Sequence, residues 1–307
     1  MEDRNLALAA EQVRSAGKGV PRLVVKTFFD EPTFTASHVA YDPATRRAAI
    51  IDSVLDFDPD SGRTSTRSAE AIVAFVESEK LAVDYLLETH AHADHLSAAP
   101  FLQQKLGGAI GIGREIVAVQ TTFGRLFNFE SEFARDGSQF DRLFSDGDHF
   151  SLGEIPAMAL HVPGHTPADV AYVIGDAAFV GDTLFMPDYG TARADFPGGD
   201  ARRLYRSIRR LLSLPDETRV FLCHDYKAPG RSAYAWETTV ADERRANVHV
   251  HDGVDEEDFV TMRVARDKTL ELPHLILPSV QVNVRGGRLP PPESNGVSYL
   301  KLPLNVL

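Results

Sequence analysis

Residues 89–95 hold the side chains with the clearest chemical meaning in the chain. They read THAHADH and directly follow the apolar stretch 83–88. The residues that can bind a metal here are His90, His92, Asp94 and His95. Neutral imidazole and carboxylate are the groups that Zn²⁺, Fe²⁺ and Mn²⁺ take from proteins. A polar turn with chance histidines would not need an enclosing strand and helix, so the spacing predicts a metal site.

Three further segments each place a ligand-type side chain just past an apolar stretch. They are Pro163-Gly164-His165-Thr166, Gly181-Asp182-Thr183 and Cys223-His224-Asp225-Tyr226. Loops at strand ends are where binding residues gather. Each of these segments alone is more often a simple turn. Together with residues 89–95 they indicate one site that is assembled from four parts of the chain.

The hydrophobic pattern predicts the elements that must hold these segments. Apolar or alternating runs predict strands at 23–28, 37–41, 48–52, 83–88, 109–112, 157–162, 170–174, 177–180 and 219–223. Helical spacing predicts helices at 65–79, from His95 to about Leu106, at 202–214 and at 256–269. Residues 123–148, rich in Phe and charge, are predicted to form a loop or lid with a short helix. This order suits a two-sheet sandwich with outer helices.

Composition and charge narrow the class of protein. The chain has 307 residues and a net charge of −12, and this acidic surplus argues against a nucleic-acid partner. Cys223 is the one cysteine, so no internal disulfide can form. Residues 1–20 lack the apolar core of a secretory signal, and no stretch approaches the ~20 apolar residues of a membrane span. We therefore expect a cytoplasmic protein without membrane contact.

The combined motifs resemble those of the metallo-β-lactamase superfamily. H-x-H-x-D-H, then G-H-T, then G-D and a late histidine at a strand end follow one another between about Leu23 and Glu243. The resemblance implies an α+β fold, a four-layer αββα sandwich with its metal site along one edge of the paired sheets. It implies a metallo-β-lactamase domain at 20–246. Residues 247–307, with a predicted helix and a Pro-rich tail, would be an extension that packs on the core or on a partner in a homo-oligomer.

The resemblance also implies two metal positions that share one ligand. One position would use His90, His92 and His165, the other would use Asp94, His95 and His224, and Asp182 would bridge them. This set implies one candidate function, a dinuclear Zn²⁺ hydrolase such as a glyoxalase II-type thioesterase or a lactonase, in which metal-bound hydroxide attacks a carbonyl. A non-enzymatic metal sensor is another class, and the intact ligand set argues against it.

One branch of the superfamily, the persulfide dioxygenases, resembles this chain most in residues 161–199 and 223–226. The segment Arg193-Ala194-Asp195-Phe196 matches that branch. The resemblance implies one Fe²⁺ per chain on a facial triad of His90, His165 and Asp182, with open positions for O₂ and substrate. The expected reaction converts glutathione persulfide, O₂ and water into sulfite and glutathione. The remaining side chains, His92, Asp94, His95 and His224, would then orient ligands and waters by hydrogen bonds.

Substrate contacts are predicted at Arg193 and Tyr226. The Arg193 guanidinium can pair with a substrate carboxylate in a bidentate fork, or it can form a structural ion pair with Asp195. Tyr226 can donate a hydrogen bond to bound substrate, or it can simply pack. Cys223 ends an apolar strand, so we expect a buried and inert thiol.

Overall fold

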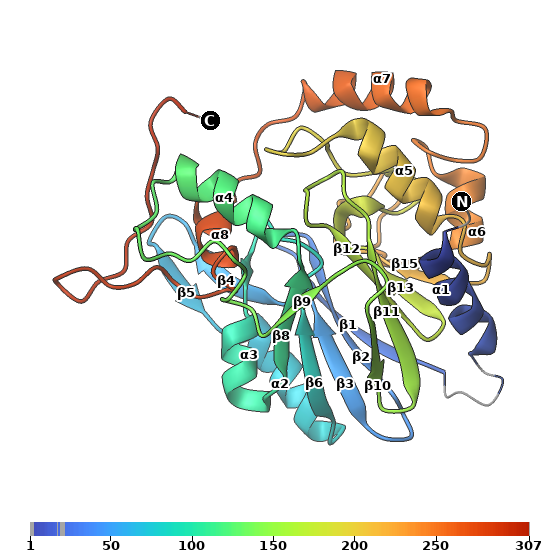
Figure 1. Cartoon of the computed structure of the whole chain (residues 1–307), viewed down its shortest axis with the longest axis horizontal. Coiled ribbons are helices and arrows are strands. Elements are labelled where there is room, and N and C mark those ends of the chain that lie inside the picture. Colours follow the sequence, from blue (N-terminus) through green and yellow to red (C-terminus); the bar gives the residue numbers. More distant parts are fainter. Residues whose placement is uncertain (1–2, 17, 19–21, 307) are drawn as a thin grey trace.

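Two six-stranded β-sheets form the centre of the molecule (Figure 1). The computed structural model describes residues 3–16, 18 and 22–306. The first sheet has the order β1 (Val24–Asp30), β2 (Thr35–Tyr41), β3 (Arg47–Ile51), β6 (Ala82–Leu87), β8 (Ala109–Gly113) and β9 (Arg142–Phe144). The second has the order β10 (His149–Leu152), β11 (Ile155–His161), β12 (Val170–Ile174), β13 (Ala177–Phe179), β14 (Arg219–Phe221) and β15 (Glu237–Thr239). A small third sheet pairs β5 (Arg63–Ser65), β4 (Val54–Asp58) and β7 (Leu96–Ser97).

Helices cover the outer face of each large sheet. Over the first sheet lie α2 (Arg67–Ser78), α3 (Ala99–Leu106), α4 (Ile116–Leu126) and α8 (Ile276–Asn283). Over the second lie α1 (Arg4–Ser15), α5 (Ala201–Leu211) and α6 (Val240–Ala246), and α7 (Glu256–Asp267) packs on α5 (Figure 1). No helix in the described part of the chain is both long and apolar enough to span a membrane.

Alternation along the strands sorts the apolar side chains into three cores. Ile50 points outward to the helices while Ile51 points inward, since successive strand residues face opposite sides of a sheet. The inner core, between the sheets, includes Ile51, Phe144 and Tyr172, all nearly inaccessible to solvent. The outer cores join each sheet to its helices. The predicted four-layer αββα sandwich is therefore confirmed.

The strands and helices predicted from the sequence are present, most with bounds shifted by one to three residues. The helix predicted to begin at His95 starts later, at Ala99, because Leu96–Ser97 is extended and pairs with Val54–Leu55 of β4. Four helices of the described chain were not predicted, α1, α4, α6 and α8. In α1 the buried side chains are mainly the small Ala9, Ala10 and Val13, which give a weak hydrophobic pattern.

The Phe-rich stretch predicted as a loop or lid is part of the fixed core. After α4 the chain forms a loop and then β9 and β10. The aromatic side chains of this loop lie in the core under the first sheet's helices, at Phe127, Phe129, Phe133 and Phe140. Glu130 also forms an ion pair with Arg285 at 2.6 Å. The loop part of the prediction is therefore confirmed, and burial of these rings argues against a lid.

Gly164, in the loop between β11 and β12, lies directly against α5, so a substitution there tests how tightly the loop packs on that helix. Its φ is +150°, and an added Cβ would lie 2.3 Å from backbone atoms of Leu204 in α5. We expect Gly164→Ala to lower the free energy of unfolding by roughly 1–3 kcal/mol, because overpacking forces the backbone apart. Urea denaturation measures this change.

Gly253→Ala is the matched control, because Gly253 also has a positive φ, +102°, but an added Cβ there meets nothing within 4 Å. It isolates the cost of the backbone conformation from the cost of the steric clash. Equal losses of stability in the two variants would contradict the packing explanation.

Candidate metal centre

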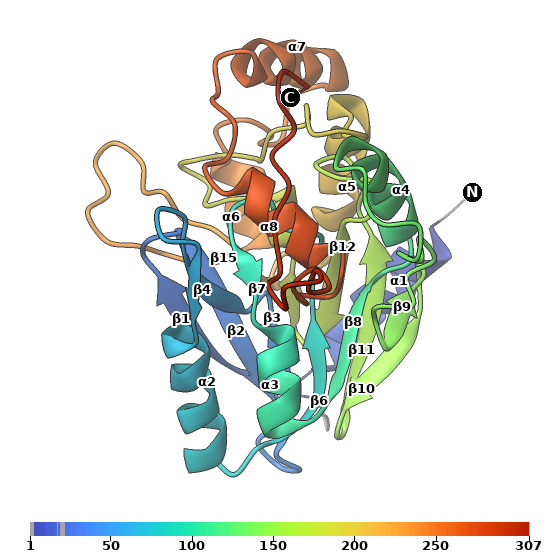
Figure 2. The same ribbon diagram turned by 90° about the vertical axis from the view of Figure 1, so that its left-hand side faces the viewer.

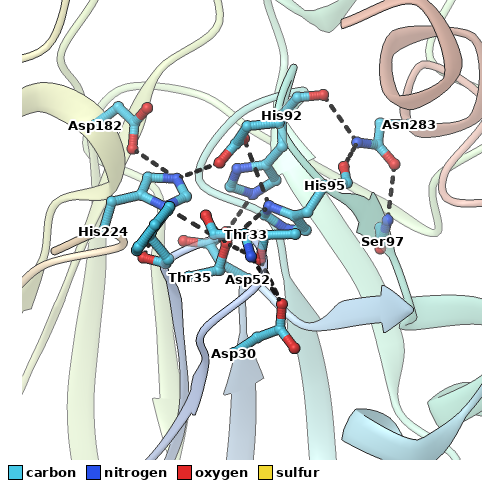
Figure 3. A network of polar contacts seen from close by, with 12 residues as sticks. Asp30, Thr33, Thr35, Asp52, His92, His95, Ser97, Asp182, His224 and Asn283 are labelled. Carbon is cyan, nitrogen blue, oxygen red and sulfur yellow. Dashed lines mark hydrogen bonds and ion pairs between the residues drawn. The ribbon is translucent and has the colours of Figure 1, made fainter. Parts of the chain in front are cut away.

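The ligand-type side chains meet where several strands end at one edge of the sandwich. Residues 90–95 follow β6, His165 lies between β11 and β12, Asp182 follows β13, and His224 follows β14. Thr35, at the start of β2, forms an isolated bridge with His224, which links this edge of the two sheets (Figure 3). Side chains up to 134 residues apart in sequence are thus brought together, as predicted for a site built from four segments.

The first group of ligand-type atoms comes from His90, His165 and Asp182. One atom of each lies within 4.8 Å of the others. Asp182 Oδ2 is 3.9 Å from His90 Nε2 and 3.6 Å from His165 Nε2. The Nδ1 atom of His165 lies 2.8 Å from the carbonyl oxygen of Arg193. Because a carbonyl only accepts, Nδ1 donates to it, and Nε2 is the ring nitrogen that faces Asp182.

The second group comes from His92, Asp94, His95 and His224, again with one atom each within 4.8 Å. His224 Nε2 is 3.0 Å from Asp94 Oδ2 and 3.3 Å from Asp182 Oδ1 (Figure 3). Asp182 therefore presents one oxygen to each group. On the other side of its ring, His224 Nδ1 lies 3.2 Å from the carbonyl oxygen of Phe34, which turns Nε2 inward.

A buried carboxylate that the sequence analysis did not single out orients His92. Asp52 lies just past β3 and is 2% exposed. Its Oδ1 is 2.9 Å from His92 Nε2, and it also accepts hydrogen bonds from the backbone N–H and the hydroxyl of Thr89. Nε2 of His92 is thereby occupied, and Nδ1 is left to face the other ligand-type atoms. The available signal was an acid at the end of the buried run AAIID.

Buried polar atoms without hydrogen-bond partners converge at this edge. Among the described residues they include His90 Nε2, His92 Nδ1, Asp94 Oδ2, His95 Nε2, Asp182 Oδ1 and His224 Nε2. Buried polar groups in proteins nearly always have a partner, and each one left without costs about 1–3 kcal/mol. Burial, with help from neighbouring imidazoles, lowers the pKa of His90 well below its usual value, which leaves that ring neutral. This donor set fits a metal ion and forms a metal-binding site.

A cavity of about 420 Å³ opens beside this metal-binding site. Its floor includes Asp94, His165 and Asp182, and one wall is aromatic. The rings of that wall belong to Phe34, Phe185, Tyr189 and Tyr226, with Tyr226 also lying 5.8 Å from the His224 ring. Residues between 263 and 275, in the C-terminal part, also line it. The volume is in the range of small-molecule sites.

The two residues predicted to contact substrate both line this cavity. The Arg193 guanidinium pairs with Asp195 through two hydrogen bonds of 2.6 and 2.8 Å and donates a third, of 2.7 Å, to the carbonyl oxygen of Glu271. The structural ion pair weighed for Arg193 is therefore formed, and three of its five N–H groups are occupied. Tyr226 is 37% exposed at the aromatic wall. Cys223 is buried, and burial raises the pKa of its thiol, in line with the inert cysteine expected.

The chain is similar in sequence to several known proteins. A probable metallo-hydrolase of Burkholderia pseudomallei is 58% identical over 295 residues, which are 93% of this chain and 100% of that protein. Glyoxylase B2 of Dictyostelium discoideum is 45% identical over 92% of this chain and 97% of its own length. The human mitochondrial persulfide dioxygenase ETHE1 is 28% identical over 94% of this chain and 98% of its own length.

The chain also resembles a solved structure and matches a family model. ETHE1 from Myxococcus xanthus superimposes with a TM-score of 0.68 and 29% identity, over 86% of this chain and 100% of that chain. Residues 59–224 match the model described as the metallo-beta-lactamase superfamily, and this range contains every ligand-type residue of both groups. With the αββα layers and the His and Asp cluster at their edge, these matches show that the chain belongs to the metallo-β-lactamase superfamily.

Proposed function

We propose that the protein is a non-haem Fe²⁺ persulfide dioxygenase. The observation that carries the proposal is the group of His90, His165 and Asp182, whose ligand atoms converge and two of which line the cavity. Two imidazoles and one carboxylate form the facial triad used by non-haem iron oxygenases. A persulfide dioxygenase related over 94% of the chain supports the same reaction.

In the proposed reaction, glutathione persulfide, O₂ and water give glutathione and sulfurous acid, which ionises to sulfite. The S–S bond breaks, the outer sulfur is oxidised and O₂ is reduced. Iron, held by His90, His165 and Asp182, would supply the binding of O₂ and sulfur and the electron transfer between them. The chain itself would orient the ligands, since Arg193 O fixes His165, and would shield the reacting sulfur with the aromatic wall.

The second group of ligand-type atoms would not hold iron in this proposal. His92, Asp94, His95 and His224 would instead arrange hydrogen bonds around the open side of the ion. Asp94 borders the cavity, where it can hold a water molecule or a substrate proton. A cytoplasmic location and a homo-oligomeric state stay predictions.

The rival function, a dinuclear zinc hydrolase, also draws on a specific observation. Asp182 Oδ1 lies 3.3 Å from His224 Nε2, while its Oδ2 faces His90 and His165, as a bridging carboxylate would. The relatives named metallo-hydrolase and Glyoxylase B2 are more similar in sequence than the human dioxygenase. A thioesterase of the glyoxalase II type would use the same cavity for a glutathione thioester.

The proposal is tested by metal content and oxygen consumption. We expect one iron per chain in protein purified without oxygen, and persulfide-dependent O₂ uptake with one sulfite formed per O₂. An oxygen electrode, a sulfite assay and metal analysis measure these. Two zinc ions per chain, with rapid hydrolysis of S-lactoylglutathione and no O₂ uptake in the iron-loaded protein, would establish the rival instead.

Two matched histidine variants separate one metal position from two. With a single iron on the first group, His165→Ala should remove both the metal and activity, whereas His95→Ala should keep one metal per chain. Both side chains are buried, so the two variants remove comparable groups. We expect at least a ~100-fold loss of kcat for His165→Ala, the upper range for loss of a metal-site group. Loss of one metal ion in each variant would contradict the single-iron assignment.

Arg266 is a further candidate for binding a substrate carboxylate. It lines the cavity in α7, is exposed, and forms no ion pair with any described residue, whereas Arg193 and Arg263, the other arginines there, are both paired with aspartates. A hydrogen bond to a charged group contributes about 1.5–3 kcal/mol.

We therefore expect Arg266→Met to raise KM for the glutathione-derived substrate roughly tenfold at nearly constant kcat, because a contact far from the reacting sulfur contributes equally in ground and transition states. Steady-state kinetics measure the two constants. Arg203→Met is the control, since Arg203 is also an exposed helical arginine and does not line the cavity. An unchanged KM for Arg266→Met would exclude this contact.

A further inference from the structure

Two helices near the end of the chain reach the loops that carry the ligand-type side chains. These helices, α7 and α8, lie outside residues 59–224, the part that matches the family model. In the described part of the chain, neither helix contributes to the His and Asp clusters. These helices form buried hydrogen bonds to the loops that carry the ligand-type side chains. Apolar packing against the core would not need such bonds.

Asn283, the last residue of α8, holds the loop of residues 90–97 from one side. Its side chain is buried, and its Nδ2 donates to the carbonyl oxygens of His92 at 2.9 Å and His95 at 2.7 Å. Its Oδ1 accepts the N–H of Ser97 at 2.8 Å (Figure 3). One amide thus satisfies three backbone groups, and α8 itself lies beside β7 (Figure 2). The loop would otherwise leave these groups buried without partners.

Arg263 and Asp267 of α7 hold a second loop. Arg263 is 1% exposed, pairs with Asp267 at 2.6 Å and donates to the carbonyl oxygen of Thr191 at 3.0 Å. Asp267 also accepts the backbone N–H of Ala194 at 3.0 Å. A buried ion pair contributes little net stability when compared with apolar packing. The hydrogen bonds that this pair directs to the backbone of residues 191–194 are therefore the better guide to its role.

The loop held by α7 is the one that orients His165. Between Thr191 and Ala194 lies Arg193, whose carbonyl oxygen accepts the hydrogen bond from His165 Nδ1 at 2.8 Å. A shift of this loop would rotate the His165 ring or break the hydrogen bond from its Nδ1 to the carbonyl oxygen of Arg193. The contacts therefore run without a break from the buried pair in α7, through the backbone of residues 191–194, to a ligand-type imidazole.

We propose that α7 and α8 are a positioning element for the metal centre. Asn283 fixes the loop of residues 90–97, which carries His90 of the proposed iron ligands as well as His92 and His95. The Arg263–Asp267 pair fixes the loop that orients His165. The proposal rests on the ligand set of the proposed function but not on the reaction, since it concerns how tightly and in what geometry a metal is held. Partners that orient ligands typically change metal affinity by 10–100-fold when removed.

The first test compares two amides on the same helix. Asn283→Ala removes the three contacts to the ligand loop. Gln281→Ala removes three hydrogen bonds of similar length, to Leu277 and to both backbone groups of Lys301 in the C-terminal tail. Both side chains are buried. Chelator competition with Zn²⁺ and Fe²⁺ measures affinity, the absorption spectrum of Co²⁺-loaded protein reports ligand geometry, and thermal unfolding of metal-free protein reports stability.

We expect Asn283→Ala to weaken metal binding roughly 10–100-fold and to alter the Co²⁺ spectrum. Gln281→Ala should lose comparable stability with affinity and spectrum unchanged. The proposal is overturned if Asn283→Ala binds metal like the wild type, or if the two variants lose affinity equally.

The second test addresses α7 and decides the question even if Asn283→Ala does not fold. Asp267→Asn keeps the side-chain shape and removes the charge that pairs with Arg263. Asp176→Asn is its control, since Asp176 forms a similar pair with Arg219 at 2.9 Å, at the turn between β12 and β13 on the far end of the sheet. Only Asp267→Asn should weaken metal binding, and equal affinities in the two variants would reject the role of α7. If Asp267→Asn weakens metal binding and Asp176→Asn does not, but the wild type shows no persulfide-dependent O₂ uptake, then the proposed reaction is rejected and the role of α7 is kept.

Discussion

The constraint on which the metal centre depends is that buried nitrogen and oxygen atoms without hydrogen-bond partners need a cation between them. Six such atoms face one another at one edge of the sandwich, and on the four histidines among them the second ring nitrogen is hydrogen-bonded. In a protein interior this arrangement is costly unless a positive charge fills it. The side chains that carry this desolvation cost follow the ends of β6, β13 and β14. The packing of the two sheets against each other keeps those strand ends together.

Orientation of the ligands comes from backbone and carboxylate groups behind them. His165 is held by the carbonyl oxygen of Arg193, His224 by that of Phe34, and His92 by the carboxylate of Asp52. Each contact occupies one ring nitrogen and so selects the nitrogen that faces the ion. The residues that define the site are therefore spread over both sheets and their loops, and the helices α7 and α8 complete the arrangement from outside.

The sequence predicts the ligand set better than it predicts what supports that set. Apolar runs such as those of β6, β11 and β13 mark strands, and a His or Asp just past such runs marks the site. The roles of Asn283 and Arg263 depend on which loops their helices approach, and single polar residues in helices carry no signal of that approach. The helix α8 was missed for a related reason, because its buried residues include polar Ser279, Gln281 and Asn283, which blur the amphipathic pattern.

The count of metal ions does not follow from the count of ligands, because the two groups differ in their surroundings. The cavity is bordered by His165, Asp182 and Asp94, while His92, His95 and His224 are inaccessible to solvent and do not line it. A substrate entering from the aromatic wall therefore meets the first group, with only Asp94 of the second at its edge. An ion held by the first group would lie beside the cavity, whereas an ion held by the second would be connected to it chiefly through Asp182 and Asp94. In the proposed function, joint binding of O₂ and sulfur needs two adjacent exchangeable sites on the ion, and the first group is the one that would offer them toward the cavity.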